Sequence, residues 1–369
     1  MYTLGSLVLF LYVVYGVTAR SCGNSDEETL ILAHVLFRHG NRTADSKAEL
    51  YPKDPYYNKT YYPIGLGQLT NAGKAKEFSI GVQLREKYGE FLGNDVYPQL
   101  VDARSSDYNR TKASLLYALA GLFPPRGEEV WSRLDWQAIP YNYQPRNKDP
   151  LLMGIECPTY LKEYDENRYS DKQQAEFQNY RDIFEYISEN SGLNVTSFQE
   201  IYNMYFGIST EVEFGLKLPA WLDKIWPEKI IELSVKEYYV SVATTNLKRM
   251  AAGYLIQKIV DDTIAKTKED PKNEFKKKLY LYSAHENNIA QMMITLDIFD
   301  DKIPNYGSFI TFEVHNINNV IGFKIYYQNY YNDDGPQLLK LPACDEFCPL
   351  DKFVKLYEEY YPTENLCGE

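Results

Sequence analysis

The stretch "LAHVLFRHGNRTAD", Leu32–Asp45, joins an apolar run to a basic turn. The run begins at residue 29, and a continuous apolar segment of this length is typical of a strand at the centre of a sheet that is covered on both faces. The basic turn then stands at the carboxyl end of the strand and contains Arg38, His39 and Arg42. Such a turn is suited to bind a phosphate group next to a nucleophilic imidazole. A basic turn without a function that happens to follow a strand would have the same composition.

Strand-like and helix-like segments alternate along the rest of the chain. Thr70 suits an N-cap, and the segment from there to Tyr88 has apolar residues at helical spacing. The segments "YPQLVDARSSDYNRT" and "LYLYSAH" indicate strands, and each precedes a predicted helix, "KASLLYALAGLF" and "ENNIAQMMITLDIF". The alternating runs "SFITFEVHN" and "VIGFKIYYQN" predict an antiparallel hairpin at the sheet edge. The pattern predicts an α/β fold with a mixed central sheet flanked by helices.

The region 125–235 differs in character, because proline-rich turns surround short helical patterns there. We interpret it as a helical cap domain inserted into an α/β domain that consists of residues 20–124 and 236–369. A long amphipathic helix from about Val235 to Lys266 is expected to lead from the cap back to the sheet.

Residues 1–19 form an apolar, uncharged segment that ends in the small-x-small pattern of residues 17–19. This pattern is suited to signal peptidase, and no second apolar run of spanning length follows. We therefore expect a signal peptide and a secreted, extracellular protein without a membrane anchor.

Four Asn-x-Thr sequons occur in the chain. Those at Asn58 and Asn194 lie in polar, loop-like stretches and are expected to carry glycans. Those at Asn41 and Asn109 lie within the candidate site, where a glycan would block access, and are interpreted as chance matches.

The chain contains 39 Lys and Arg against 51 Asp and Glu, which gives a net charge of −12. A strongly acidic body disfavours nucleic acid and anionic membranes as partners, and we expect neither. Most of the 34 tyrosines are expected to pack, but a few could line a pocket for a flat or cationic ligand. No Cys-x-x-Cys pair is present and the histidines lack metal-ligand spacing, so no metal site is predicted.

Charged side chains follow three of the predicted strands: the basic turn of residues 38–42, Arg104, and the pair His285-Glu286. Because ligands of open α/β sheets bind beyond the carboxyl ends of the strands, we expect these three ends to converge. Phosphoryl transfer needs positive charge around the phosphoryl oxygens, an in-line nucleophile and an acid for the leaving oxygen. These residues supply that set, and Asp107 and Arg110 are expected to brace the loop of Arg104 by local hydrogen bonds.

At these residues the chain resembles the histidine acid phosphatases, whose pattern is Arg-His-Gly-x-Arg-x-Pro near the amino terminus and His-Asp near the carboxyl terminus. The segments "ELYPKDPYY", "LTNAGKAKEF", "LREKYGEFLG" and "CDEFCPL" make it most similar to the secreted insect venom and salivary members. The resemblance spans nearly the whole chain and implies an α/β fold with a helical cap. It implies no cofactor.

The resemblance also implies roles for single residues. His39 would be the nucleophile that becomes phosphohistidine, and Glu286 would be the acid in place of the family's aspartate. The residues that would hold the phosphoryl oxygens are Arg38, Arg42, Arg104 and His285.

The five cysteines fit an oxidising compartment and leave at least one unpaired. The sequence alone does not choose the pairing. The resemblance suggests the disulfides Cys157–Cys367 and Cys344–Cys348, with Cys22 left over.

Three departures from the family pattern lie at the site. Asn41 is a neutral residue where many members carry aspartate. Ala44 replaces the proline of the motif, which removes a fixed φ angle and is expected to loosen the loop that aims Arg42. Glu286 is one methylene longer than aspartate, and general acid catalysis, which contributes about 10²- to 10⁴-fold, depends on the reach of the acid.

Two functions are compatible with these features. The first is an acid phosphomonoesterase that acts through phospho-His39. The second is a protein with weak or no turnover that sequesters small host mediators, namely biogenic amines such as serotonin or histamine, or cysteinyl leukotrienes. The altered loop and acid, the acidic body and the many tyrosines favour the binding protein, which is the working hypothesis. The ligand and the oligomeric state stay open, with a homodimer among the alternatives.

Overall fold

A mixed sheet forms the centre of the computed structural model, which describes residues 28–331, 334–363 and 366–367. The signal peptide predicted for residues 1–19, and Cys22, lie outside the described residues. The sheet has seven strands in the order β2-β3-β1-β4-β5-β6, with β7 paired to β5. Its strands are β1 (Leu30–Arg38), β2 (Val101–Ser105), β3 (Leu279–Ala284), β4 (Phe309–Ile317), β5 (Val320–Gln328), β6 (Gln337–Leu339) and β7 (Cys348–Pro349).

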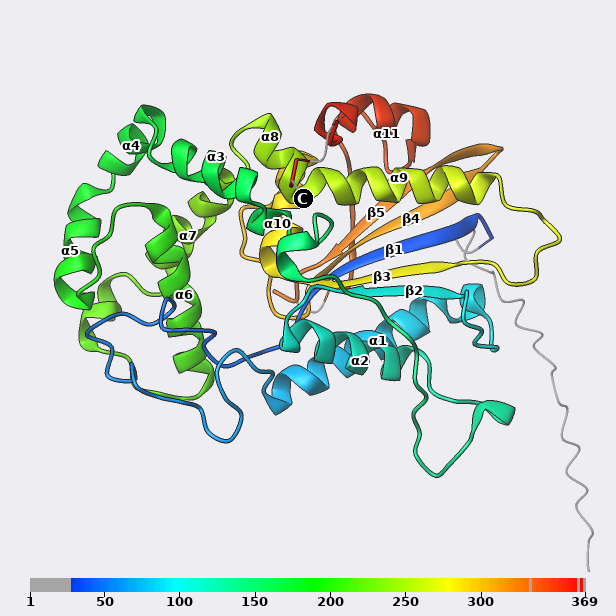
Figure 1. Cartoon of the computed structure of the whole chain (residues 1–369), viewed down its shortest axis with the longest axis horizontal. Coiled ribbons are helices and arrows are strands. Elements are labelled where there is room, and N and C mark those ends of the chain that lie inside the picture. Colours follow the sequence, from blue (N-terminus) through cyan, green and yellow to red (C-terminus); the bar gives the residue numbers. More distant parts are fainter. Residues whose placement is uncertain (1–27, 332–333, 364–365, 368–369) are drawn as a thin grey trace, which may run out of the picture.

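Strand β1 lies at the centre of the sheet and is covered on both faces, as the apolar run predicts. It pairs in parallel with β3 and antiparallel with β4. Leu32 and Leu36 point into a core shared with helices α9 (Tyr254–Thr267), α10 (Glu286–Thr295) and α11 (Leu350–Tyr357). Val35 and Phe37 point into a core shared with α1 (Asn71–Leu92) and α2 (Asn109–Leu122). The two layers of helices enclose the sheet (Figure 1).

Helix α1 begins where the sequence predicts. The side chain of Thr70 caps it by accepting a hydrogen bond of 3.1 Å from the backbone N–H of Gly73. The buried face contains Ile80, Leu84 and Tyr88, whereas Phe78 is 47% exposed. The stripe of Ile80, Leu84 and Tyr88 is therefore the packing surface of the helix.

The helices α3 (Pro158–Arg168), α4 (Asp171–Gln178), α5 (Arg181–Ser191), α6 (Phe198–Glu213) and α7 (Glu228–Ser241) gather at one end of the sheet (Figure 1). They share a core that is separate from the two cores of the sheet. We call this group the cap helices. Helix α7 crosses the expected boundary at residue 235, and the division into residues 20–124 and 236–369 with a cap at 125–235 stays a proposal.

The prediction of one long helix from Val235 to Lys266 is wrong. Helix α7 ends at Ser241, the short α8 spans Thr245–Lys248, and a π-helical turn over Arg249–Gly253 leads into α9. The side chain of Thr244 accepts a hydrogen bond from the backbone N–H of Leu247, so a helix starts anew there. Threonine side chains favour caps over helix interiors, and this preference outweighs the continuous apolar periodicity.

Strands β4 and β5 form the predicted antiparallel hairpin. Its turn residues Asn318 and Asn319 both have positive φ angles, 53° and 65°, which asparagine tolerates better than most residues. The hairpin does not form the sheet edge, because both β6 and β7 pair with β5.

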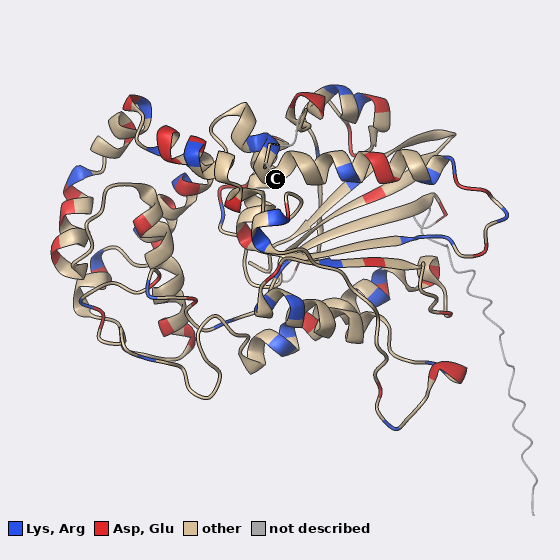
Figure 2. Ribbon diagram, in the orientation of Figure 1, with Lys and Arg blue, Asp and Glu red and all other residues tan. Residues whose placement is uncertain are grey.

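Charged residues lie mainly on helices and loops, and the central strands carry few of them (Figure 2). Within the described part of the chain, no helix is long and apolar enough to span a bilayer. Asn58 and Asn194 are exposed, as is Asn109. Glycosylation of Asn58 and Asn194 stays a prediction.

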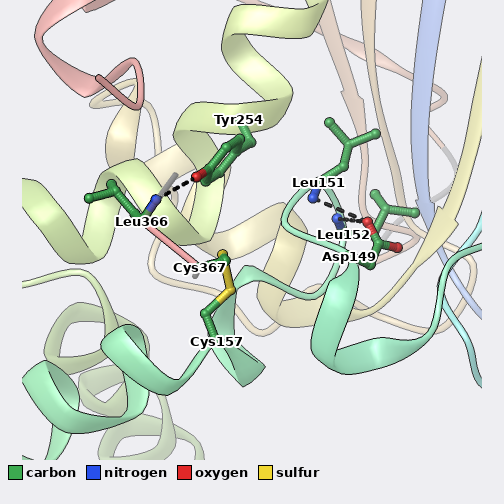
Figure 3. Close-up of a disulfide and its surroundings, with 7 residues drawn as sticks. All are labelled: Asp149, Leu151, Leu152, Cys157, Tyr254, Leu366 and Cys367. Carbon is green, nitrogen blue, oxygen red and sulfur yellow. Dashed lines mark hydrogen bonds between the residues drawn. A yellow bond between two sulfur atoms is a disulfide. The ribbon is translucent and has the colours of Figure 1, made fainter. Parts of the chain in front are cut away.

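The structure contains the disulfides Cys157–Cys367 and Cys344–Cys348. Cys157 immediately precedes α3, so the first bridge fastens the carboxyl-terminal segment to the cap helices (Figure 3). Beside it, the backbone N–H of Leu366 donates a hydrogen bond of 3.2 Å to the hydroxyl of Tyr254, the first residue of α9. The carboxyl-terminal segment therefore connects the cap helices to the helix layer on the sheet.

Replacing Cys157 and Cys367 together by serine should lower the free energy of unfolding by up to about 5 kcal/mol, because that bridge closes a loop of 210 residues. The matched control is the double variant Cys344→Ser/Cys348→Ser, which opens a loop of 4 residues and should lower the free energy by about 2 kcal/mol. Chemical denaturation of both variants measures the difference. Equal losses would contradict the loop-closure argument.

Candidate active site

The carboxyl ends of β1 and β3 bring two histidines together. Arg38 pairs with Ala284 in register, and the backbone N–H of His39 donates a hydrogen bond of 3.1 Å to the carbonyl of Ala284. His285 follows directly and opens helix α10. As a result the imidazole rings of His39 and His285 meet edge to face, with their centroids 5.5 Å apart.

Two glycines allow the basic turn to lie directly on α1. A Cβ atom on Gly40 would stand 2.5 Å from the carbonyl oxygen of Gly73, and one on Gly73 would stand 2.2 Å from the carbonyl oxygen of Asn41. Any larger residue at either position would push the turn away from the helix. The backbone N–H of Gly40 also donates a hydrogen bond of 3.2 Å to Ser114 of α2.

The imidazole of His39 is held in one tautomer. Its Nδ1 lies 2.9 Å from the carbonyl oxygen of Gly40, and a carbonyl only accepts, so Nδ1 carries the proton and Nε2 keeps its lone pair. Burial lowers the pKa of His39 well below its usual range, and the guanidinium groups of Arg110 and Arg38 lower it further. His39 is therefore a neutral imidazole whose Nε2 has a free lone pair.

Three buried guanidinium groups surround His39, those of Arg38, Arg42 and Arg110. Arg38 donates a hydrogen bond of 2.7 Å to the carbonyl of Pro304 and stacks on Tyr306, with 3.8 Å from Cζ to the ring centroid. These contacts leave its Nε and Nη2 without a hydrogen-bond partner.

Arg42 and Arg110 are each paired with a carboxylate. Arg42 forms a bidentate pair with Glu49, with N–O distances of 2.8 and 2.6 Å. Nη1 of Arg110 lies 3.0 Å from Oδ1 of Asp45. The Nε atom of each arginine has no hydrogen-bond partner. Buried donors are almost always satisfied in folded proteins, so this group of open donors around one imidazole indicates a binding site for an anion.

Glu286 and His285 complete the group from the start of α10. The hydroxyl of Tyr202 on α6 donates a hydrogen bond to Oε1 of Glu286, and Oε2 lies 3.6 Å from Nε of Arg38. His285 Nε2 lies 3.0 Å from the hydroxyl of Ser106, and burial lowers the pKa of His285 well below its usual range. The cap helices thus position the carboxylate, whereas the sheet layer positions both histidines.

Arg104, expected to hold the anion, is not among the charged residues that act on His39. Alternation along β2 places Arg104 on the same face of the sheet as its register partner Tyr282, which belongs to the core under α9 and α10. There its Nη2 lies 2.5 Å from Oδ1 of Asp149, a carboxylate with no exposed surface. The same oxygen accepts the backbone N–H groups of Leu151 and Leu152 (Figure 3). Arg104 therefore holds the carboxylate that fixes the loop of Leu151 and Leu152.

Arg110 is the residue that sequence reasoning missed, because it was interpreted as a brace for Arg104. It is the second residue of α2, and a helix that follows a parallel strand begins at the carboxyl edge of the sheet. That position is the signal which could have identified it. A residue in the first turn of the helix faces the edge, whereas a residue inside the strand is directed to one face or the other.

The loop after Arg42 keeps its shape without the motif proline. Ala44 is fully buried, its carbonyl accepts a hydrogen bond of 2.8 Å from Gly67, and the N–H of Thr43 donates one of 3.0 Å to Gln68. The bidentate pair with Glu49 then aims the guanidinium of Arg42. These contacts supply the restraint that the substitution at Ala44 was expected to remove.

A cavity of about 520 Å³ borders the turn, and its lining includes Asn41, Glu213 and Tyr306. The cavity lies beside the basic turn through Asn41, and none of the three arginines is part of its lining. Within the described residues, no three side chains of His, Cys, Asp or Glu are grouped as metal ligands.

Arg110→Ala should weaken the binding of inorganic phosphate at least tenfold, because a hydrogen bond to a charged group contributes about 1.5–3 kcal/mol. Arg104→Ala should leave phosphate affinity close to that of the wild type. It should instead lower the free energy of unfolding by about 3–5 kcal/mol, because Asp149 stays buried without its cation. Calorimetric titration and denaturation separate the two variants. The reverse pattern would return Arg104 to the site.

Comparison with known proteins agrees with this geometry. The model of the histidine phosphatase superfamily, branch 2, matches residues 29–328. The chain is 35% identical to venom acid phosphatase Acph-1 of Apis mellifera over 99% of its own length and 92% of the relative's. It is 29% identical to lysosomal acid phosphatase of Homo sapiens, over 97% and 84% of the two chains.

Solved structures show the same fold. The Hafnia alvei phytase in complex with tartrate has a TM-score of 0.67 at 17% identity and covers 92% of this chain and 98% of its own. The Klebsiella phytase has a TM-score of 0.65 at 16% identity, with coverage of 92% and 98%. On the family match and the relatives together, the chain belongs to the histidine phosphatase superfamily, branch 2.

Proposed function

We propose that the chain is a secreted acid phosphomonoesterase that forms a phosphohistidine at His39. One observation carries the proposal: Nε2 of His39 is unprotonated and lies among three buried guanidinium groups whose Nε atoms have no hydrogen-bond partner. A phosphate ester would satisfy these donors and meet a nucleophile at the same time. The names of relatives such as venom acid phosphatase Acph-1 and lysosomal acid phosphatase support the same class of reaction and a route through the secretory pathway.

The reaction has two steps. Nε2 of His39 attacks phosphorus, the bond between phosphorus and the ester oxygen breaks, and protonated Glu286 transfers its proton to the departing oxygen. Water then attacks the phosphohistidine, and the Glu286 carboxylate takes up a proton from that water. The bond between nitrogen and phosphorus breaks, inorganic phosphate leaves, and His39 is restored.

The contacts of Glu286 support its role as the acid despite its extra methylene. The hydrogen bond from Tyr202 fixes one carboxyl oxygen, and the other lies toward Arg38, the residue next to the nucleophile. The hydrogen bond from Tyr202 therefore limits the positions that the longer side chain can take. The proposal therefore places hydrolysis ahead of the binding function that the sequence favoured.

Sequestration of small mediators remains the second candidate. It is supported by a tyrosine-lined cavity next to Glu286 and by the net charge of −12, which attracts cations such as serotonin and histamine. The guanidinium groups would suit the carboxylates of a cysteinyl leukotriene. A protein that binds these compounds and shows no turnover of any phosphate ester would make this candidate the primary function.

The rate should not fall between about pH 7 and about pH 5, because the lowered pKa keeps His39 unprotonated over a range in which an ordinary histidine gains a proton. The loss expected from protonation of the nucleophile begins only below the lowered pKa. The measurement is kcat/KM for 4-nitrophenyl phosphate across this range, with His39→Ala as the inactive control. A decline that starts near pH 6.5, or turnover that survives in the control, would contradict the proposed nucleophile.

Glu286→Gln should reduce kcat/KM for an alkyl phosphate by about 10²- to 10⁴-fold, because kcat/KM reports the step in which the leaving group departs and this poor leaving group needs the proton. For 4-nitrophenyl phosphate the loss should be smaller, since nitrophenolate leaves without full protonation. Glu286→Asp is the matched variant and should retain part of the rate on both substrates. Equal losses on the two substrates in the glutamine variant would show that Glu286 acts on something other than the leaving group.

A further inference from the structure

A chain of buried hydroxyl groups leads away from His285 toward the start of α2. Nε2 of His285 lies 3.0 Å from the hydroxyl of Ser106, which lies 2.9 Å from the hydroxyl of Thr111. The Thr111 hydroxyl in turn lies 2.9 and 3.0 Å from the carbonyl oxygens of Ser106 and Tyr108. Ser106 and Thr111 have no exposed surface, so bulk water does not compete for these hydrogen bonds.

The ends of two neighbouring strands hold this chain in place. Ser106 directly follows β2, and its backbone N–H donates a hydrogen bond of 3.0 Å to the carbonyl of Ser283 in β3. Thr111 is the third residue of α2. Because His285 follows β3, the Ser106 hydroxyl is fixed beside its ring by the pairing of the two strands.

The carbonyl groups at the far end determine the direction of the chain. A carbonyl oxygen only accepts, so Thr111 donates to a carbonyl, Ser106 donates to Thr111, and Nε2 of His285 donates to Ser106. All three side chains donate a hydrogen bond in this order. In the reverse order Thr111 donates to Ser106 and Ser106 donates to His285, so the bond to the carbonyl is lost. Buried polar groups are costly without a partner, and the first order is therefore favoured.

This order gives the two histidines of the site opposite tautomers. Burial and the guanidinium groups of Arg110 and Arg42 hold the pKa of His285 well below its usual range, so its ring carries one proton. That proton is on Nε2, where it is bonded to Ser106. In His39 the proton is on Nδ1, and Nε2 has the lone pair.

The two rings lie within reach of each other. Their centroids are 5.5 Å apart and their planes are inclined by 76°. A hydrogen bond of about 3 Å together with the radii of two imidazole rings spans a separation of this size. Without Ser106, the Nε2 proton of His285 would lack its acceptor, and the Nε2 lone pair of His39 would be an alternative. Such a bond would occupy the lone pair that attacks phosphorus in the proposed reaction.

We propose that Ser106 is a positioning residue, which accepts the Nε2 proton of His285 and thereby keeps the lone pair of His39 free. The inference rests on the proposed function of His39 as the nucleophile. Ser106 acts through His285, and Thr111 supports it by accepting the proton of Ser106. His285 then donates no hydrogen bond to a phosphoryl oxygen, because its one N–H is bonded to Ser106. The arginines hold the phosphoryl oxygens.

Ser106→Ala should lower kcat/KM for 4-nitrophenyl phosphate about tenfold, because a hydrogen bond between the two histidines must break before each attack. Calorimetric titration with inorganic phosphate should give an affinity close to that of the wild type, since the arginines are unchanged. Ser106→Thr keeps the hydroxyl and should retain most of the rate. Equal losses of kcat/KM and phosphate affinity in Ser106→Ala, or an equal loss of rate in Ser106→Thr, would overturn the proposal.

Ser105→Ala is the matched control for the loss of a buried hydroxyl. The hydroxyl of Ser105 donates a hydrogen bond of 2.8 Å to the carbonyl of Ser106 and belongs to the same strand end. This variant should keep a kcat/KM close to that of the wild type. A loss as large as that of Ser106→Ala would show that the rate does not depend on the acceptor for His285, and would overturn the proposal.

Nuclear magnetic resonance of the ring nitrogens tests the tautomers without reference to turnover. The chain has four histidines, so variants that lack one histidine assign the ¹⁵N signals. At pH 7 we expect His285 to be protonated at Nε2 and His39 at Nδ1. In Ser106→Ala the Nε2 signal of His39 should shift as it accepts a hydrogen bond.

A proton on Nδ1 of His285, or an unshifted His39 signal in Ser106→Ala, would overturn the proposal. A wild type that has these tautomers but hydrolyses no phosphate ester would contradict the proposed function and still support the hydrogen-bond chain. The failure of the function and the failure of the chain are therefore distinct results.

Discussion

Three buried guanidinium groups repel one another, and the other groups of the site compensate for this repulsion. Each group is neutralised or satisfied by a different part of the chain: Arg38 by the carbonyl of Pro304, Arg42 by Glu49, and Arg110 by Asp45. Removing one partner would leave a charge buried without compensation, which is far more costly than losing a surface ion pair. The Nε atoms of these three arginines have no acceptor in the protein. A bound anion would supply the acceptors.

The same field determines the state of the nucleophile. A buried imidazole beside several cations is held neutral, so His39, the proposed nucleophile, keeps the lone pair of Nε2 in mildly acidic solution. The acidic body repels phosphate esters at long range, and the arginines overcome that repulsion only at close range. The cap helices contribute through Tyr202, whose hydroxyl holds Glu286 and whose ring forms a wall of the tyrosine-lined cavity. A ligand in that cavity would therefore touch the residue that positions the acid.

Periodicity in the sequence was sufficient to predict the central strand, the hairpin and the cap of α1, because apolar spacing and local hydrogen bonds determine these features. It was not sufficient for the helix after Val235, where Thr244 caps a new helix within an unbroken apolar pattern. For the site, residue type and strand position identified His39, Arg38 and Arg42. To choose between Arg104 and Arg110, one must know at which residue β2 ends and at which residue α2 begins. Sequence patterns do not locate the ends of helices and strands to a single residue.

The most direct test of the account is to trap the intermediate. The protein would be mixed with a phosphate ester, quenched within the first turnover under conditions that preserve phosphohistidine, digested and examined by mass spectrometry. The account predicts one phosphoryl group, attached to His39, that disappears on longer incubation as inorganic phosphate is released. Turnover without any phosphorylated peptide, or a phosphoryl group on another residue, would contradict the claim that the buried arginines exist to present a phosphate to this imidazole.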